Sequence, residues 1–199
     1  MKSLIAIVFL TGLIFAAPMP VAPVAFAVDA AHSNIGFDVS IMGGLSNVSG
    51  KFTDFTVDFN VDEKDITKST VNVVIKAASI DTGIERRDAH LRNPDFFDVE
   101  KFPEIMFKSK SVTKKGKKVT LIGDFTMHGV TKEISFPFTV AGRIVNTKDQ
   151  TIKYGFNGNL SLNRRDYGIN YANPADPTFI GDMVKVDLNL LTRGTKTAK

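Results

Sequence analysis

Residues 81–107 read DTGIERRDAHLRNPDFFDVEKFPEIMF, and this segment is the one long interruption in a chain that otherwise has the pattern of β-strands. The polar run from Arg86 to Arg92 predicts a short helix that ends before Pro94. Phe96 and Phe97 follow, and Pro103 leads back into an extended segment. We therefore predict a short helical insertion between two strands.

Outside this segment, apolar residues recur at every second position, which is the period of a half-buried strand. A change of parity between Phe52 and Phe55 predicts a bulge in the second strand. The eight predicted rows comprise Ile35, Phe37, Val39 and Ile41; Phe55, Val57, Phe59 and Val61; Val71, Val73, Ile75 and Ala77; Ile105 and Phe107; Val119, Leu121, Gly123 and Phe125; Ile134, Phe136, Phe138 and Val140; Phe156, Gly158, Leu160 and Leu162; and Val184, Val186, Leu188 and Leu190.

The connections between these rows are short and carry turn residues, as in residues 114–118 and 146–149. Short connections imply antiparallel neighbours, arranged either as an open sandwich or as a closed barrel. A barrel is favoured because closure removes the exposed edges of the sheet. The predicted fold is all-β: an eight-stranded antiparallel barrel with a short helical insertion between strands 3 and 4.

The chain begins with a basic residue, Lys2, and an apolar run, and Ala25-Phe26-Ala27 offers a small-x-small cleavage site. We predict a signal peptide over residues 1–27 and a single barrel domain over residues 28–199. The apolar run is short for a membrane span and is followed by prolines, so an uncleaved anchor is the weaker alternative. The predicted location is the periplasm, or the medium for a host that lacks one.

Composition excludes several classes of function. The formal net charge of the whole chain is +4, which is too mild to argue for nucleic acid as a partner. The chain contains no cysteine, so thiol catalysis, cysteine-ligated zinc and iron–sulfur clusters are excluded. An exported chain without disulfides depends on packing for its stability.

An eight-stranded barrel is either filled by its own side chains or wide enough for one slender ligand. The chain holds 16 phenylalanines but no tryptophan and only 3 tyrosines. The phenylalanine side chain has no hydrogen-bonding group, so it suits an apolar tunnel and a solid core equally well. Composition alone leaves both alternatives open.

The order and spacing of several short motifs resemble the YceI-like family of polyisoprenoid-binding proteins. The helical segment resembles the family pattern R-D-x-H-L-R-x-x-D-F-F-D followed by F-P. Family members often carry a histidine near the end of the first strand, where this chain has Ile41. The other motifs that match are His32-Ser33 with Phe37, Gly50-Lys51-Phe52, Asp81-Thr82, Gly123-Asp124-Phe125-Thr126, Gly129-Val130-Thr131-Lys132 and Asn163-Arg164-Arg165-Asp166-Tyr167-Gly168.

This resemblance implies a lipocalin-like barrel whose tunnel holds a polyisoprenoid, such as an isoprenoid quinone or its precursor, or a similar long-chain lipid. It implies non-covalent binding for carriage or storage, and no reaction follows from it. We also expect no cofactor and no stable membrane insertion. Burial of ten methylenes is worth roughly 8 kcal/mol before ordering costs, so a tail could be held without polar contacts. A homodimer remains open.

We predict that the ligand contacts the inward rows of the strands and the helical insertion near the barrel mouth. The proposed ligand-binding residues are Phe37, Val39, Phe52, Val73, Ile75, His90, Arg92, Phe107, Leu121, Phe136, Phe138, Leu160 and Val186.

Catalytic and metal sites find little support in the sequence. His32, His90 and His128 are far apart, without the spacing of metal ligands, and no serine–histidine–acid pattern is apparent. Arg86, Asp88 and Arg92 of the helical run suit structural ion pairs better than binding contacts, and Arg164 with Asp166 suits a structural clasp at least as well as a binding contact. Two alternatives stay open: an enzyme that acts on a lipid head group at the mouth, and a solidly packed structural or interaction barrel.

Overall fold

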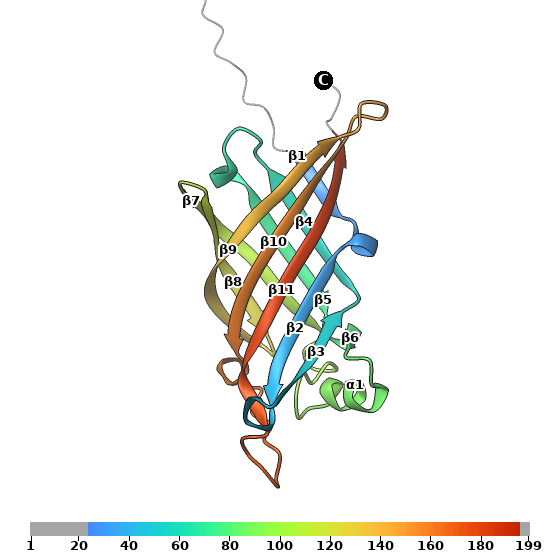
Figure 1. Cartoon of the computed structure of the whole chain (residues 1–199), viewed down its shortest axis with the longest axis vertical. Helices are drawn as coiled ribbons and strands as arrows, with labels where there is room; N and C mark the ends of the chain where they lie inside the picture. Colours follow the sequence, from blue (N-terminus) through green and yellow to red (C-terminus); the bar gives the residue numbers. More distant parts are fainter. Residues whose placement is uncertain (1–23, 196–199) are drawn as a thin grey trace, which may run out of the picture.

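The computed structural model describes residues 24–195, which form a twisted, closed antiparallel barrel with one α-helix at one end (Figure 1). The strands are β1 (Val24–Val28), β2 (Asn34–Ile41), β3 (Ser46–Phe52), β4 (Phe55–Val61), β5 (Thr70–Lys76), β6 (Ile80–Asp81), β7 (Glu104–Lys115), β8 (Lys118–Met127), β9 (Val130–Val145), β10 (Thr151–Asn163) and β11 (Ile180–Thr195). The helix is α1 (Glu85–Arg92), and single 3-10 turns are η1 (Ala30–His32), η2 (Met42–Gly44), η3 (Ile66–Lys68), η4 (Ala77–Ser79) and η5 (Arg164–Tyr167).

The wall of the barrel consists of eight strands, because three of them are interrupted. β1 and β2 pair with successive parts of β11 and are separated by η1. β3 and β4 pair with β2 and β1 respectively, with a break at Thr53 and Asp54 that realises the predicted bulge as a kink. β5 and β6 are separated by η4 and pair with β4 and β3. The predicted eight-stranded antiparallel barrel is confirmed.

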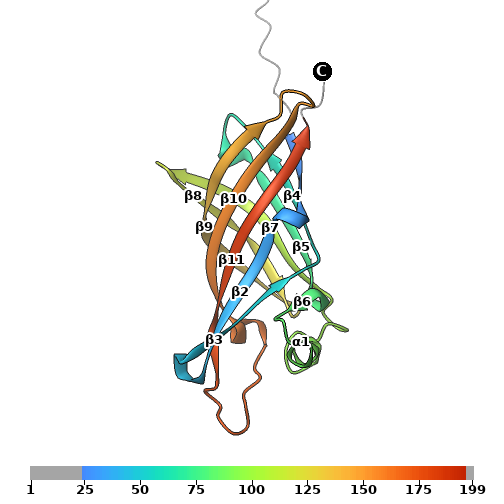
Figure 2. The same cartoon turned by 45° about the vertical axis from the view of Figure 1, so that its right-hand side comes forward.

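The strands meander in sequence order, and pairing of β1 with β11 closes the ring. The long strands β8 to β11 run obliquely to the barrel axis, as closure of a sheet requires (Figure 2). The predicted turn at residues 114–118 is confirmed, since β7 passes into β8 through Gly116, whose φ of 62° suits glycine. Side chains alternate between the lumen and solvent, as in β4, where every second residue is buried.

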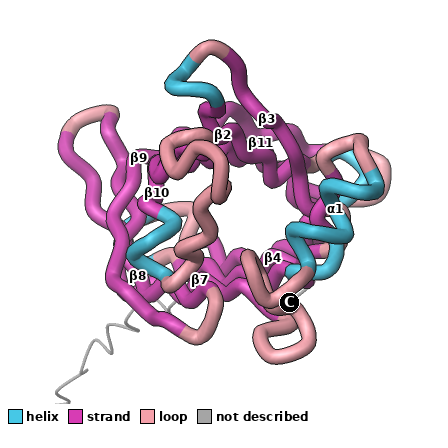
Figure 3. The backbone as a smooth tube through the Cα atoms, turned by 90° about the horizontal axis from the view of Figure 1, so that it is seen from below, coloured by secondary structure: helices cyan, strands magenta, loops and turns pink. Residues whose placement is uncertain are grey.

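The predicted helical insertion is confirmed as α1, which ends at Arg92 with Asn93 as its C-cap. Seen along the barrel from this end, α1 lies at one side of the ring, and the segment between β10 and β11 crosses part of the opening (Figure 3). We call this end the mouth; it is formed by α1, residues 93–103 and residues 168–179. The opposite end carries the β9–β10 turn and the last residues of β11 (Figure 1).

The barrel begins at Val24, four residues before the predicted domain boundary at residue 28. Val24 to Ala27 pair with β4, and Phe26 is buried. Most of the predicted signal peptide, residues 1–23, lies outside the described residues, and the cut after Ala27 remains a prediction. Among the helices of residues 24–195, none has the length and hydropathy needed to cross a bilayer.

Candidate functional site: an apolar cavity behind the mouth

The half of the barrel nearer the mouth contains a cavity of about 410 Å³. Its lining is almost entirely apolar and comes from the strands around the ring, from α1 and from the segments at the mouth. Twelve of the thirteen predicted residues line it: Phe37, Val39, Phe52, Val73, Ile75, His90, Phe107, Leu121, Phe136, Phe138, Leu160 and Val186. Parity therefore placed the inward rows on the correct face, while their contact with a ligand remains a prediction.

Two glycines allow large rings to lie flat on the wall. A Cβ added at Gly50 would collide with the ring of Phe37, and one added at Gly123 would lie 2.6 Å from the ring of Phe107. Real Cβ atoms do not approach so closely. The two rings therefore occupy space that the side chain of any residue other than glycine would take at positions 50 and 123. The rings thus coat the wall and leave the centre of the lumen free.

The cavity ends where Phe59 on β4 faces Phe156 on β10. Their ring centroids lie 4.6 Å apart and their planes are inclined by 10°. Both residues line the cavity and are buried. β4 and β10 are not paired with each other but are separated by β1 and β11, so the stack spans the lumen. We call this pair the floor.

Beyond the floor the lumen is packed solid. The ring of Tyr154 stacks on Phe156 at 5.8 Å, and Phe26 meets Tyr154 edge to face at 5.2 Å. Val61, Ile152 and Thr192 belong to the same region, are nearly inaccessible and do not line the cavity. Composition left open whether the lumen is filled by side chains or wide enough for a ligand. The barrel combines both, because one half is filled and the half nearer the mouth is hollow.

A polar cluster seals the filled end. Arg143 donates to the Glu63 carboxylate from Nε at 3.0 Å and from Nη2 at 2.9 Å, and the Tyr154 hydroxyl donates to the same oxygen at 2.9 Å. Burial, reinforced by the bond to Glu63, raises the pKa of Tyr154, and the bond to Glu63 raises the pKa of Arg143. Both shifts favour the forms that donate these bonds to Glu63, the protonated phenol and the charged guanidinium.

Three rings meet across the mouth. His90 of α1 contacts Phe96 edge to face at 5.0 Å and Tyr171 at 5.2 Å, and Phe96 lies 4.7 Å from Tyr171. All three line the cavity. The imidazole Nε2 also lies 3.0 Å from Oδ2 of Asp95, and both side chains are about half exposed. We call His90, Phe96 and Tyr171 the aromatic gate, because they join two segments of the mouth and line the cavity there.

The helix is anchored by Asp88, which is 4% exposed. Its carboxylate accepts hydrogen bonds from the backbone N–H of Thr82, at 2.9 Å, and from the Thr82 hydroxyl. Arg87 donates to the hydroxyl and carbonyl of Thr82 at 2.7 and 2.8 Å, so its guanidinium is occupied although the residue lines the cavity. The predicted structural role of Asp88 agrees with these contacts.

Arg92 is the predicted binding residue that does not line the cavity. Its guanidinium donates to the carbonyls of Ala78 at 2.9 Å and Ile80 at 3.2 Å, and to the carboxylate of Glu85 at 3.2 Å. These bonds tie the last turn of α1 to η4 and β6. Arg92 therefore lies outside the cavity lining, and its contact with a ligand near the mouth remains a prediction.

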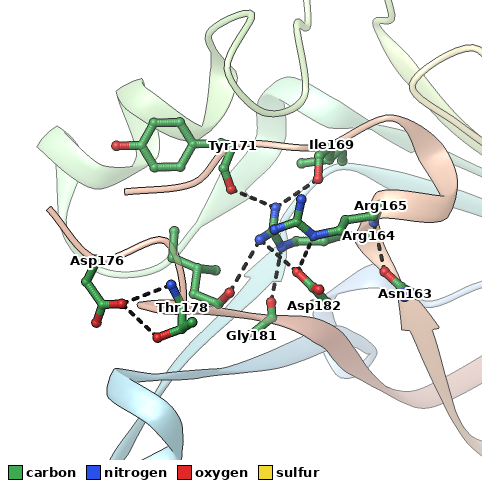
Figure 4. Close-up of polar contacts among 10 residues, drawn as sticks. Asn163, Arg164, Arg165, Ile169, Tyr171, Asp176, Thr178, Gly181 and Asp182 are labelled. Atoms are coloured by element: carbon green, nitrogen blue, oxygen red, sulfur yellow. Dashed lines mark hydrogen bonds and ion pairs between the residues drawn. The ribbon is translucent and has the colours of Figure 1, made fainter. Parts of the chain in front are cut away.

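Arg164 organises the long segment between β10 and β11 (Figure 4). Its guanidinium donates to the carbonyls of Ile169 and Tyr171 at 2.8 and 2.9 Å, and to the Asp182 carboxylate at 3.0 Å. Further bonds reach the carbonyls of Ile180 and Gly181 at 3.3 and 3.1 Å. Burial lowers the pKa of Arg164, opposed by the charge of Asp182. The predicted structural clasp is thus seen at Arg164, whereas Asp166 pairs with Lys132 on the surface.

The remaining histidines serve local structure. His32 lies 3.0 Å from Asp29 on the surface, and Nδ1 of His128 lies 3.1 Å from the carbonyl of Tyr167. Within residues 24–195, no three histidine, aspartate or glutamate residues converge as metal ligands. In the same part of the chain, every fully buried side-chain nitrogen or oxygen has a partner. The deep cavity therefore presents no polar group that requires a ligand.

Among the cavity residues that sequence reasoning missed, three groups shape the floor and the mouth. Phe59 and Phe156 belong to predicted rows, but nothing in their spacing distinguishes a floor from a wall. Tyr171 lies in an irregular segment rich in asparagine and proline, where periodicity gives no direction. Ile41, at the end of β2, lines the cavity together with Phe179.

Comparisons with known proteins agree with this architecture. The family model described as the YceI-like domain matches residues 26–191. A UPF0312 protein of Vibrio parahaemolyticus is 36% identical over 196 residues, covering 94% of this chain and 97% of the relative. The crystal structure of Burkholderia cenocepacia BcnA has a TM-score of 0.71 at 22% identity and covers 82% of this chain and 98% of that chain. A polyisoprenoid binding domain from Saccharophagus degradans has a TM-score of 0.61 at 18% identity, over 86% of this chain and 99% of that domain. The chain therefore belongs to the YceI-like family.

Proposed function

We propose that this protein binds a polyisoprenoid, or a lipid with a similarly long apolar tail, non-covalently inside the barrel. The observation that carries the proposal is the apolar cavity of about 410 Å³, floored by Phe59 and Phe156 and covered by the aromatic gate. The apolar lining of such a cavity makes dispersion contacts with a tail that enters it. The polyisoprenoid binding domain of Saccharophagus degradans, which shares the fold, supports this ligand class.

The chemistry of the wall favours a tail over a polar ligand. Buried side-chain polar atoms in the described part of the chain already have partners, so a polar ligand deep in the cavity would lose its hydration without compensation. A tail pays no such cost and gains about 0.8 kcal/mol for each methylene removed from water. The head group therefore remains near the mouth, beside His90 and Tyr171.

Carriage or storage in the periplasm is part of the proposal. It rests on the basic and apolar start of the chain and on the apolar lining of the cavity. Within residues 24–195, His90 and Asp95 at the mouth are the one imidazole–carboxylate pair beside the cavity. Replacing His90 by Gln tests the enzymatic alternative: a carrier returns a loaded prenol unchanged in both proteins, whereas an enzyme would convert it only with His90 present.

Direct titration tests the binding itself. Gly158 lines the cavity, and an added Cβ there would sit 3.5 Å from Leu188 and from Phe136, so Gly158→Leu places a side chain in the lumen without a backbone clash. We expect wild-type protein to bind geranylgeraniol and the variant to bind it at least about tenfold more weakly. Gly142→Leu is the matched control, because Gly142 is exposed on β9 with no atom near its Cβ position. Equal affinities for all three proteins would exclude the lumen as the site.

A further inference from the structure

The floor gives the cavity a single open end. Phe59 and Phe156 are 5% exposed each, and the rings and aliphatic side chains beyond them do not line the cavity. The Glu63–Arg143–Tyr154 cluster closes the same end by three hydrogen bonds of 2.9 to 3.0 Å. A tail therefore has one way in, through the mouth, and it stops at the stacked rings.

We propose that Phe59 and Phe156 act as a ruler that sets the length of apolar tail the barrel can bury. This inference rests on the proposed function and adds the residues that determine its specificity. Carbons that fit between the mouth and the floor leave water and contribute to affinity. Carbons beyond that length stay outside the mouth and contribute little.

The stack is suited to this role because both rings have close neighbours in the lumen. Phe156 is flanked by Tyr154 at 5.8 Å and by Phe138 at 6.3 Å. Phe59 lies opposite Phe26 in the β1–β4 register. A ring packed on several sides does not swing aside at small cost, because the surrounding side chains would have to leave their own rotamers. The floor is therefore a fixed stop, whereas the gate at the mouth rests on a few ring contacts.

Removing one ring should move the stop by a defined step. Without Phe156, the next ring on the same strand is that of Tyr154, two residues earlier in β10 and further from the mouth, with its centroid 5.8 Å from that of Phe156. That step is comparable to one isoprene unit. In the opposite direction, a side chain at Gly158 raises the stop toward the mouth, because Gly158 precedes Phe156 on the path from the mouth.

The test is a chain-length series of all-trans prenols, titrated into the whole protein by displacement of a fluorescent fatty acid. In wild-type protein we expect affinity to rise with each isoprene unit and then to stop rising. In Phe156→Ala the break moves to a longer prenol, with a gain of about tenfold for the added unit, and in Gly158→Leu it moves to a shorter one. Phe59→Leu provides a milder version of the first change, and Gly142→Leu should keep the wild-type break.

The outcomes separate the two proposals. Binding of prenols with the same break in wild-type protein, Phe156→Ala and Gly158→Leu would overturn the ruler while leaving lipid binding intact. Absence of prenol binding by wild-type protein would instead contradict the proposed function. If Phe156→Ala does not fold, Phe59→Leu and Gly158→Leu decide the question, since a ruler requires their breaks to move in opposite directions.

Discussion

The imidazole of His90 on α1 meets the ring of Tyr171, in the segment between β10 and β11, edge to face with centroids 5.2 Å apart and planes at 87°. Phe96 contacts both rings. Two segments that are distant in sequence are thus joined across the mouth by ring contacts worth about 0.5 to 1.5 kcal/mol each. Contacts of this size can break and re-form while the barrel stays folded.

Tyr171→Ala should accelerate both loading and release of a lipid. The substitution removes two of the three ring pairs in the gate, while the wall and the floor remain. We expect the release rate, measured by stopped-flow transfer of a fluorescent prenol to vesicles, to rise by roughly tenfold. The equilibrium affinity should change less, because most of the buried area lies deeper. Tyr171→Phe keeps the ring and should behave as wild-type; an unchanged release rate in Tyr171→Ala would show that the gate does not limit exit.

Arg164→Lys should destabilise the protein although it preserves the charge. Arg164 is buried and donates to four carbonyls and to Asp182 in a fork that an ammonium group cannot reproduce. We expect the free energy of unfolding in urea to fall by about 3 kcal/mol and residues 168–179 to become more sensitive to protease. Arg165→Lys is the control, since Arg165 is exposed and its bond to Asp182 is worth about 1 kcal/mol or less. Equal losses in the two variants would contradict the role of Arg164.

Tyr154→Phe should change how stability depends on alkaline pH. Burial and the bond to Glu63 raise the pKa of Tyr154, so the folded protein keeps the phenol proton to a higher pH than the unfolded chain, whose tyrosine titrates near pH 10. The resulting stabilisation is present below about pH 10 and is lost as pH rises through the folded-state pKa. We expect the free energy of unfolding to fall less steeply above about pH 10 in the variant, and identical slopes would contradict this linkage.

The start of the mature chain has a measurable structural consequence. A chain that begins at Val28 lacks Phe26, whose ring is 2% exposed and packs on Tyr154, and it loses the pairing of β1 with β4. We expect it to be less stable to urea than a chain that begins at Val24, by about 3 to 5 kcal/mol. Phe26→Ala in the longer chain separates the ring from the pairing. Equal stability would mean that a cut after Ala27 costs the barrel nothing, and the mass of the exported chain shows where the cut occurs.

Much of the barrel could be predicted from the sequence, because the lumen imposes one periodicity on every strand. Val184 and Val186 show the alternation as clearly as Phe136 and Phe138 do, and all four line the cavity. Alternation fails at β1, whose few residues resemble the end of a signal peptide as much as a strand. Its place in the wall depends on pairing with β4 and β11, which local sequence does not encode.

The depth of the cavity could not be predicted for a related reason. Parity shows which side chains point inward, but whether two inward rings meet across the lumen depends on the register of strands that are not neighbours. Phe59 and Phe156 stack, whereas Phe37 and Phe107 lie on the wall beside glycines. The direction of the Arg92 side chain could not be predicted either. From a helix at the mouth it could reach the cavity or the neighbouring backbone, and it donates to the carbonyls of Ala78 and Ile80.

The most direct test of lipid binding is organic extraction of the protein purified from its native host, followed by mass spectrometry of the extract. Lipid binding in the lumen predicts a long-chain isoprenoid lipid near one mole per mole of wild-type protein and of Gly142→Leu, and far less from Gly158→Leu, whose lumen is obstructed. Wild-type protein that yields no stoichiometric lipid, and that cannot be loaded with a prenol afterwards, would contradict it.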